Sequence, residues 1–454
     1  MQELKHLSSK KRTDDAGFSK SSHVNRMNRR SGERTFPRLS MPTGKRREQL
    51  KHLLLFLAVV LALTPCSVYL MKKTPKAVTG ATSWIRSAAE AAKAPPVNSF
   101  DTAYTLLDSA IGPPDHLTAR TTDGQVLHYS VNGGLQKRIH DFMAVSQVPY
   151  GVFVAIEPAT GRILAMTSHS STDPNWAQKS FFELYPMASL FKIITASAAL
   201  EAKKITPETV VEFRGNAYSE NPRKWSALPR GKNNRMDVTY AMGKSINPVY
   251  GRVACDIAGK TSVMECVDRF GFNQTLLPGT PTKESKAAEP QSSMELMLMG
   301  AGLDHEVKIS PLHAAVMMAA IANGGRMMAP GMVDRITDGQ GAQKDSFTPH
   351  ELRRLVSPET AASLKRMLSS TVTSGTSRKA FHDRRGRPRV PVDIAAKTGS
   401  INGTDPRGHY SWFAAFAPAN NPKIALVALV INQDKWKIKS SQVGEQALEE
   451  FFNH

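Results

Sequence analysis

The chain has 454 residues, enough for one large domain or two ordinary ones, and its composition (41% hydrophobic, 22% charged) excludes a protein that is disordered throughout. The net charge of +20 is uneven, because residues 1–50 contain thirteen Lys and Arg against five Asp and Glu, a net +8. A basic tail can bind nucleic acid, but no recognition motif accompanies this one, so no nucleic-acid partner is expected.

The first 150 residues divide into three segments. Residues 1–50 have almost no apolar periodicity and are predicted to be a disordered basic tail. Residues 53–71 contain no charge, and at about 1.5 Å rise per residue they would span roughly 28 Å, close to the hydrocarbon thickness of a bilayer. Residues 72–147 are predicted to be a linker and a short membrane-proximal region.

The basic excess on the N-terminal side of this apolar run predicts its orientation. By the positive-inside rule, the tail lies in the cytoplasm and everything after the run lies outside the cytoplasmic (inner) membrane, in the periplasm. A cleaved signal peptide is the disfavoured alternative, because a charged leader of about fifty residues is longer than the usual 15–30 residues.

The main domain is predicted to occupy residues 148–454. Two β-rich runs at its start are separated by a four-residue turn at 158–161, and a second pair of strands closes the chain. Strands at both ends with helices between them predict one antiparallel sheet flanked by helices, in the mixed α/β (α+β) class. The closing strands are predicted at 409–418 and 423–432. The intervening helices are predicted at 189–204, 311–325 and 357–370, and the terminal helix at 440–453.

The first candidate motif is Ser189 with Lys192. Residues i and i+3 share one face of a helix, so the lysine amine can reach the serine hydroxyl. A serine needs a neighbouring base to act as a nucleophile, and the apolar neighbours Leu190, Phe191 and Ile193 would favour a neutral lysine. The helix N-terminus offers unpaired N–H groups to developing negative charge. Alone, this pattern also occurs by chance in many long chains.

The second candidate motif is Ser245 with Asn247. In an extended or loop segment their side chains point the same way. Ser245 would then relay a proton between Lys192 and a leaving amine, while Asn247 would bind a substrate amide and brace the lysine. The alternative is a helix-capping serine, because an apolar run follows.

The third candidate motif comprises Lys397, Thr398, Gly399 and Ser400. Residues 392–396 are predicted to be a strand with Lys397 near its end, and Gly399 would allow close approach of a substrate backbone. A cationic lysine and a threonine hydroxyl suit a substrate carboxylate, and the Ser400 N–H would complete an oxyanion hole. The alternative is an ordinary strand end with a turn glycine.

Ser-x-x-Lys, Ser-x-Asn and Lys-Thr-Gly occur here in the order that is typical of penicillin-binding proteins and class A β-lactamases. Residues 130–454 resemble the transpeptidase domain of high-molecular-weight penicillin-binding proteins, with its first strands near 151–166 and its closing strands at 409–432. By this resemblance Ser189 is the acylated nucleophile and Lys192 its general base. It also implies that the cleft is lined by Ser245 and Asn247, and that the substrate carboxylate and the oxyanion are held by Lys397, Thr398 and Ser400.

The resemblance implies a peptidoglycan D,D-transpeptidase that cross-links stem peptides, is inhibited covalently by β-lactams and needs no cofactor. The alternatives are a D,D-carboxypeptidase, which uses water as the acceptor, and, less favoured, a β-lactamase or a non-enzymatic β-lactam sensor. The gap of 152 residues between Ser245 and Lys397 resembles that of large cell-wall transpeptidases. No segment resembles the Glu-x-x-x-Asn pattern of class A β-lactamases, which disfavours rapid drug hydrolysis.

Four further expectations concern partners and secondary features. Only about 75 residues separate the apolar run from the main domain, too few for a glycosyltransferase domain, so a separate glycan polymerase is a hypothetical partner. Cys255 and Cys266 flank a predicted turn, and their pairing stays open. No Cys/His cluster has zinc spacing, so no metal site is expected. The basic cluster at 382–389 is predicted to be an exposed hairpin tip, either merely solvated or in contact with anionic wall polymer or membrane.

Overall fold

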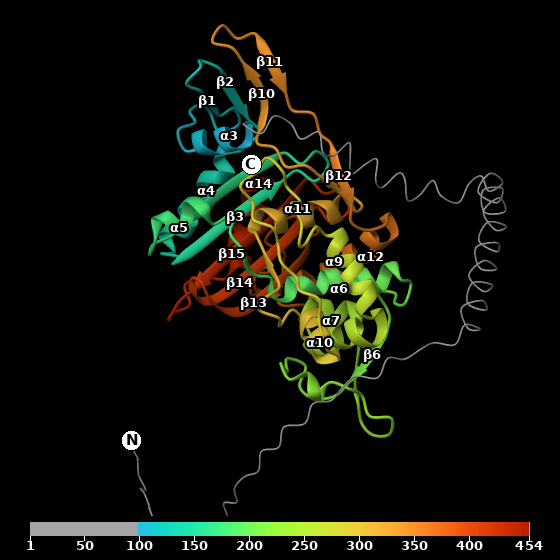
Figure 1. The fold of residues 1–454 in the computed structure, drawn as a ribbon. Coiled ribbons are helices and arrows are strands. Elements are labelled where there is room, and N and C mark those ends of the chain that lie inside the picture. Colours follow the sequence, from blue (N-terminus) through green and yellow to red (C-terminus); the bar gives the residue numbers. More distant parts are fainter. Residues whose placement is uncertain (1–98, 454) are drawn as a thin grey trace, which may run out of the picture. The chain divides into compact units, whose positions relative to one another are not determined.

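The computed structural model describes residues 99–453 (Figure 1). The predicted basic tail at 1–50 and the predicted membrane span at 53–71 lie outside the described residues. Among residues 99–453, no helix is both long enough and apolar enough to cross a bilayer.

A five-stranded antiparallel sheet forms the centre of the described chain, in the order β13-β14-β15-β3-β4. Two of its strands come from the start of the domain and three from its end, which confirms the prediction of one antiparallel sheet that both ends build. The strands are β3 (Tyr150–Ile156), β4 (Ile163–His169), β13 (Ala395–Thr404), β14 (Arg407–Ala417) and β15 (Ile424–Asn432).

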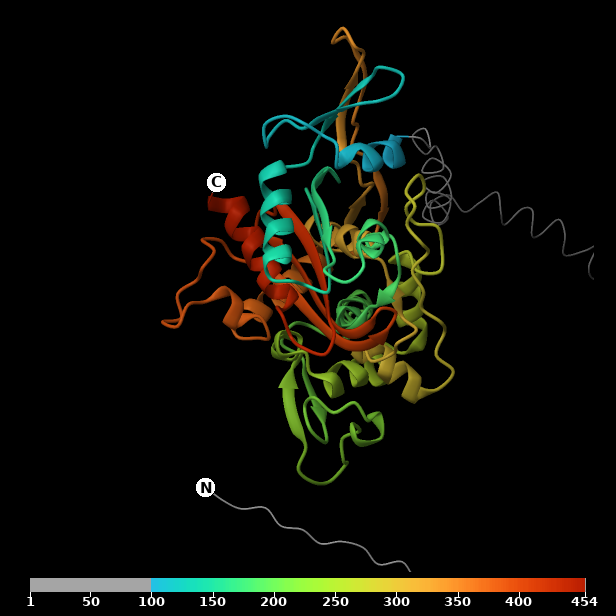
Figure 2. The same cartoon turned by 90° about the vertical axis from the view of Figure 1, so that its left-hand side faces the viewer.

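Both faces of this sheet are buried, which explains why its central strands are continuous apolar runs rather than alternating ones. Along β15, Val427 and Leu429 face one core, while Leu426 and Ala428 face the other. Helix α11 (Pro311–Ala322) packs on the first face. Helices α4 (Gly133–Val145) and α14 (Ser440–Asn453) lie side by side on the second (Figure 2).

A helical region packs on the side of the sheet that carries α11 and continues beyond the edge strand β13 (Figure 1). Its central helix, α6, is buried along almost its whole length, as expected for a helix that is apolar on all sides. The helices of this region are α6 (Phe191–Glu201), α7 (Val238–Lys244), α8 (Asn247–Arg252), α9 (Lys260–Arg269), α10 (Ser293–Ala301) and α12 (Pro358–Thr373). The short helix α13 (Arg378–Phe381) contacts α14 on the second face of the sheet.

Smaller elements complete the described chain. A four-stranded sheet, β1-β2-β10-β11, lies at the top of Figure 1, and the pairs β5–β8, β6–β7 and β9–β12 lie elsewhere. Their bounds are β1 (Thr118–Arg120), β2 (Val126–Tyr129), β5 (Tyr185–Pro186), β6 (Val210–Phe213), β7 (Asn234–Asp237), β8 (Lys308–Ile309), β9 (Arg326–Met328), β10 (Val333–Thr337), β11 (Gln343–Ser346) and β12 (Glu351–Arg354). The remaining helical pieces are α3 (Ser99–Leu107), α5 (Pro174–Lys179), η1 (Ala188–Leu190), η2 (Pro222–Lys224) and a π-helical segment, η3 (Val253–Ala258).

One local prediction was wrong, and a second was right only in part. The strand predicted at 392–396 is β13, which begins only at Ala395 and runs to Thr404, so Lys397 lies near its start rather than its end. The strand continues through Gly399 because every residue of β13 pairs with β14. The turn predicted between the two cysteines is shortened to Gly259, with φ +85, since the residues after it already belong to α9. Cys255 and Cys266 are both free thiols.

Candidate active site

Ser189 lies in the short η1 turn that leads directly into α6. The residue before it, Ala188, has a left-handed backbone with φ +53, which non-glycine residues adopt only at a cost. Gly302, at the C-terminal end of α10, supports this turn from below, since a Cβ at Gly302 would lie only 2.1 Å from the Ala188 carbonyl oxygen. The serine side chain is 8% exposed. The fold therefore holds Ser189 in a fixed position that a small opening leaves accessible.

The amine of Lys192 is surrounded by three oxygen atoms. Nζ lies 2.7 Å from Ser189 Oγ, 2.9 Å from Asn247 Oδ1 and 2.5 Å from the carbonyl oxygen of Ala301. The last two atoms can only accept hydrogen bonds, whereas a hydroxyl can also donate. A neutral amine has two N–H donors and one lone pair. When both donors are used by Asn247 and Ala301, the lone pair faces the hydroxyl of Ser189.

The surroundings of Lys192 favour this neutral form. The side chain is fully buried, and no carboxylate forms an ion pair with it within residues 99–453. The pKa of Lys192 is well below its ordinary value of 10.5, mainly because the amine is buried and, to a smaller extent, because of the nearby charge of Lys397. The arrangement can therefore remove a proton from Ser189 at neutral pH.

The second motif lies at the junction of two helices rather than in an extended loop. Ser245 ends α7 with a left-handed backbone, φ +59, and Asn247 is the first residue of α8. The positive φ turns the two side chains to different lysines: the Ser245 hydroxyl lies 2.9 Å from Lys397 Nζ, while Asn247 binds Lys192. Ser245 is thus a helix C-cap, and the alternative that it caps the following helix was wrong.

Lys397 is the second buried amine of the site. Its Nζ donates to Ser245 Oγ at 2.9 Å and to the Thr398 carbonyl oxygen at 2.7 Å. Burial lowers its pKa to about 7, so both charge states are accessible at neutral pH. The Thr398 hydroxyl lies 2.6 Å from that of Thr376, whose own N–H donates to the Gly243 carbonyl oxygen of α7. These contacts connect the edge strand β13 to the end of α7.

Gly399 brings this edge strand against the Ser189 turn. A Cβ added at Gly399 would lie 3.1 Å from Ala188 Cβ and 3.4 Å from the Ser189 backbone nitrogen. The side chain of the next residue, Ser400, is exposed and opposite Ser411 in the β13–β14 ladder. The peptide unit between Gly399 and Ser400 therefore lies close to the Ser189 N–H, as a two-donor oxyanion hole requires.

The structure brings all three motifs together, through the contacts Ser189–Lys192–Asn247 and Ser245–Lys397. Sequence reasoning missed three residues that support them: Ala301, which accepts from Lys192; Gly302, beneath Ala188; and Thr376, which contacts Thr398. Ala301 and Gly302 follow the methionine-rich part of α10. The Gly-Ala-Gly sequence there has little side-chain bulk, and it was the signal in the sequence that could have identified these two residues.

A separate groove of about 460 Å³ lies between α12 and the chain that precedes β13. None of the motif residues lines it, so it is distinct from the site of Ser189. Its walls include Lys365, Val372, Phe381, Val390 and Ile394.

Comparisons with known proteins agree with this geometry. The model of the penicillin-binding protein transpeptidase domain matches residues 151–453. The peptidoglycan D,D-transpeptidase PbpA of Mycobacterium tuberculosis is 30% identical over 357 residues, which cover 70% of this chain and 70% of that protein.

Solved structures of the M. tuberculosis protein also resemble the chain. The crystal structure of PBPA has a TM-score of 0.59 at 26% identity, with 71% of this chain and 80% of that chain covered. The structure of the same protein described as a penicillin G acyl-enzyme complex has a TM-score of 0.58 at 26% identity, with 72% and 80% covered. This chain belongs to the family of penicillin-binding proteins with a transpeptidase domain.

Proposed function

We propose that the chain is a peptidoglycan D,D-transpeptidase that cross-links stem peptides through an acyl-enzyme on Ser189 and is inhibited covalently by β-lactams. The observation that carries this proposal is the 2.7 Å contact between Lys192 Nζ and Ser189 Oγ, made by an amine whose other two neighbours are carbonyl oxygens. Relatives named as D,D-transpeptidases, and a relative solved as a β-lactam acyl-enzyme, support the reaction class.

In the first half-reaction, Ser189 Oγ attacks the carbonyl carbon of the penultimate D-Ala while its proton moves to Lys192 Nζ. The oxygen of the tetrahedral intermediate accepts hydrogen bonds from the backbone N–H groups of Ser189 and Ser400. The C–N bond to the terminal D-Ala then breaks, and the leaving amine takes up a proton. Ser245, beside Lys397, relays to this amine the proton that Lys192 took from Ser189, and the products are an ester on Ser189, a neutral Lys192 and free D-Ala.

The terminal carboxylate of the donor peptide is held by Lys397 and Thr398. An anion beside Lys397 Nζ favours its charged form, so binding of the carboxylate raises the pKa of this lysine and recruits a proton to the site. In the second half-reaction, an amine of a neighbouring stem peptide attacks the ester and Ser189 regains its proton. A β-lactam follows the first half-reaction, with its ring amide in place of the peptide bond, and remains attached as an ester.

The test separates cross-linking from its alternatives. The full-length protein in detergent is incubated with a donor stem peptide ending in D-Ala-D-Ala and an amine acceptor, and the products are identified by mass. A cross-linked product that a β-lactam abolishes supports the proposal. Release of D-Ala without cross-linked product would make the chain a D,D-carboxypeptidase, and no release by folded protein would make it a non-enzymatic β-lactam sensor.

We also propose that residues 53–71 anchor the protein in the inner membrane and that residues 148–454 form the periplasmic transpeptidase domain. The absence of charge in residues 53–71 and the basic excess before them support this topology. Protease added to intact spheroplasts should degrade the transpeptidase domain and spare the tail. A separate glycan polymerase as partner is part of the same proposal, and purification from membranes without any polymerase would contradict it.

A further inference from the structure

The positive charge of the described chain is concentrated in two segments. Residues 99–453 contain 40 Lys and Arg against 33 Asp and Glu, a net +7. Residues 214–235 carry six basic residues against one acidic residue, a net +5, and residues 378–389 carry the same excess. The rest of this part of the chain therefore has a net charge of −3.

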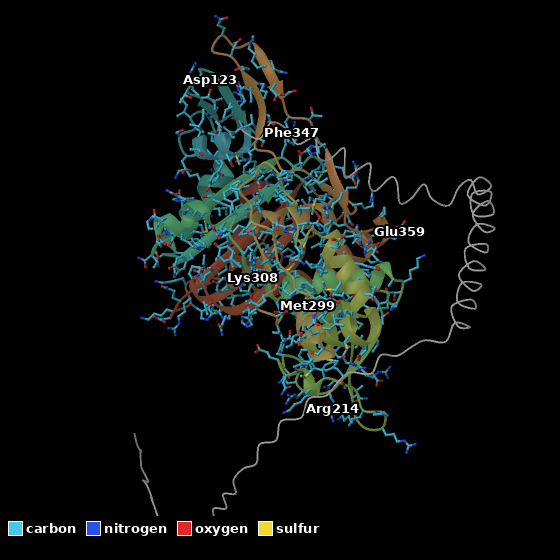
Figure 3. All side chains as sticks on the ribbon, in the orientation of Figure 1. Asp123, Arg214, Met299, Lys308, Phe347 and Glu359 are labelled. Atoms are coloured by element: carbon cyan, nitrogen blue, oxygen red, sulfur yellow. The ribbon has the colours of Figure 1, made fainter. Side chains whose placement is uncertain are left out.

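The first basic segment is attached to Asn247. This asparagine donates from its side-chain amide to the carbonyl oxygens of Tyr218, at 3.5 Å, and Ser219, at 3.4 Å. Its backbone N–H donates to the Ala217 carbonyl oxygen at 3.2 Å. The residue that orients Lys192 thus also fixes the start of this segment, which begins at Arg214 near the lower end of the molecule (Figure 3).

The second basic segment is attached to Thr398. Thr376, whose hydroxyl contacts that of Thr398, is followed after two residues by Arg378, where α13 begins. From α13 the chain continues through the turn at Asp383 and Gly386 to Arg389, which confirms the predicted exposed hairpin tip. Each basic segment is therefore anchored to a different residue of the proposed active site.

Most of the cations in the two segments are available to a partner. Eleven of the twelve cationic residues are exposed, and eight of these form no ion pair with an acid within residues 99–453. These eight are Arg223, Lys224, Arg230, Lys232, Arg378, Lys379, Arg384 and Arg385. Clusters of exposed basic groups raise the local concentration of an anionic ligand and speed its association.

We propose that these two segments form a binding surface for the anionic peptidoglycan strand, and that they deliver stem peptides with ionised carboxylates to Ser189. This inference rests on the proposed transpeptidase function and specifies its substrate as an extended polyanion. The position of the two segments favours an extended peptidoglycan strand as the ligand, because each segment is anchored to a residue of the same site. Only one stem peptide of a donor strand is acylated at a time, so the rest of a polymeric substrate must lie on the surface beside the site.

The test compares matched sets of substitutions in the full-length protein in detergent, so that the basic tail contributes equally to every variant. One variant replaces Arg223, Lys224, Arg230 and Lys232 with Ser, and another replaces Arg378, Lys379, Arg384 and Arg385 with Ser. The control variant replaces Lys179, Lys203, Lys286 and Lys423, which are exposed cations of other regions. The probes are labelled, uncross-linked strands with free carboxylates and the same strands after chemical amidation, and binding is followed by fluorescence anisotropy.

We expect each test variant to bind the carboxylate strands about tenfold more weakly at low salt, with a smaller loss at high salt. Binding of the amidated strands should not change, and the control should stay within about twofold of the unsubstituted protein. Wild-type binding by both test variants, or equal losses for both kinds of strand, would overturn the proposal. So would a loss confined to binding of phosphatidylglycerol vesicles, which would make the surface a membrane contact.

Covalent labelling of Ser189 by penicillin at high salt is a separate measurement that tests the proposed transpeptidase function. Labelling of both test variants at the rate of the unsubstituted protein shows that they are folded and that their sites are intact. If penicillin fails to label even the unsubstituted protein, the transpeptidase proposal fails, while the strand measurements still decide whether the basic surface binds polyanions.

Discussion

Gly302 lies directly beneath Ala188, the residue before the proposed nucleophile. Gly302 has φ +69, and a Cβ at this position would approach the Ala188 carbonyl carbon to 2.6 Å and Ser189 Cα to 2.8 Å. Two residues with strained or glycine-only backbones thus meet where Ser189 must be held. Ala301, the last residue of α10 and the one before this glycine, accepts a hydrogen bond from Lys192. The end of α10 therefore positions both the nucleophile and its proposed base.

We therefore predict that Gly302→Ala slows acylation of Ser189 by at least tenfold, because the added methyl group displaces the turn that contains Ser189. The positive φ alone should cost about 1–2 kcal/mol of stability. The control is Gly279→Ala, since Gly279 also has a positive φ of +81 but no atom lies within 4 Å of the added Cβ. Equal acylation rates for the two variants would show that the contact with Ala188 is unimportant.

Asn247→Asp should shift the pH dependence of acylation. The substitution places a carboxylate where Oδ1 now lies 2.9 Å from Lys192 Nζ, and a nearby negative charge favours the ammonium form. The pKa of Lys192 rises, so the acid limb of the rate profile should move up by about one to three pH units, and the rate at neutral pH should fall. Asn234→Asp, at an exposed position, serves as the control. An unchanged acid limb would argue against Lys192 as the base.

The stability of the protein should increase with pH in the range where Lys397 titrates. Its pKa is about 7 in the folded protein against an ordinary value of 10.5, so between these values the unfolded chain binds more protons. The free energy of unfolding should therefore rise with pH from about pH 7 to 8.5, by at most about 1.4 kcal/mol per unit for one proton. Lys397→Met should reduce this slope and Lys179→Met should not, as urea unfolding at several pH values would show.

Thr376→Val should weaken the hold on the substrate carboxylate without touching the nucleophile. The substitution removes the partner that lies 2.6 Å from the Thr398 hydroxyl, a hydrogen bond worth about 1 kcal/mol, or roughly fivefold in affinity. We expect the concentration of penicillin that gives half-maximal labelling rate to rise, with little change in the maximal rate. Thr373→Val, in the last turn of α12, is the control. A fall in the maximal rate alone would contradict a role in carboxylate binding.

The parts of the site that depend on local geometry could be predicted from the sequence. Ser189 and Lys192 are three residues apart at a helix start, so their contact follows from helical spacing alone. The strand β15 and the helix α11 were likewise predicted, because both are long and almost entirely apolar runs. That the three motifs meet in one site was implied by the resemblance to penicillin-binding proteins that their order carries.

The remaining features depend on tertiary packing, which no local pattern reveals. The contact of Lys192 with Ala301 spans 109 positions, and that of Thr376 with Thr398 joins the segment between α12 and α13 to a strand. Lys397 was predicted near the end of a strand, with Gly399 beyond that end allowing close approach of a substrate, yet pairing with β14 carries β13 past Gly399. The left-handed backbone of Ser245, which aims the hydroxyl at Lys397, is set by the junction of two helices.

The role of Ser189 as nucleophile is tested most directly by labelling the full-length protein with a fluorescent penicillin and measuring the adduct by intact mass over time. We predict a stable adduct of one penicillin per chain that is absent from Ser189→Ala and formed about 10²–10⁴ times more slowly by Lys192→Met. Ser197→Ala, two turns further along α6, should be labelled normally. Adduct formation by Ser189→Ala, or rapid loss of the adduct with turnover of the drug, would contradict the account.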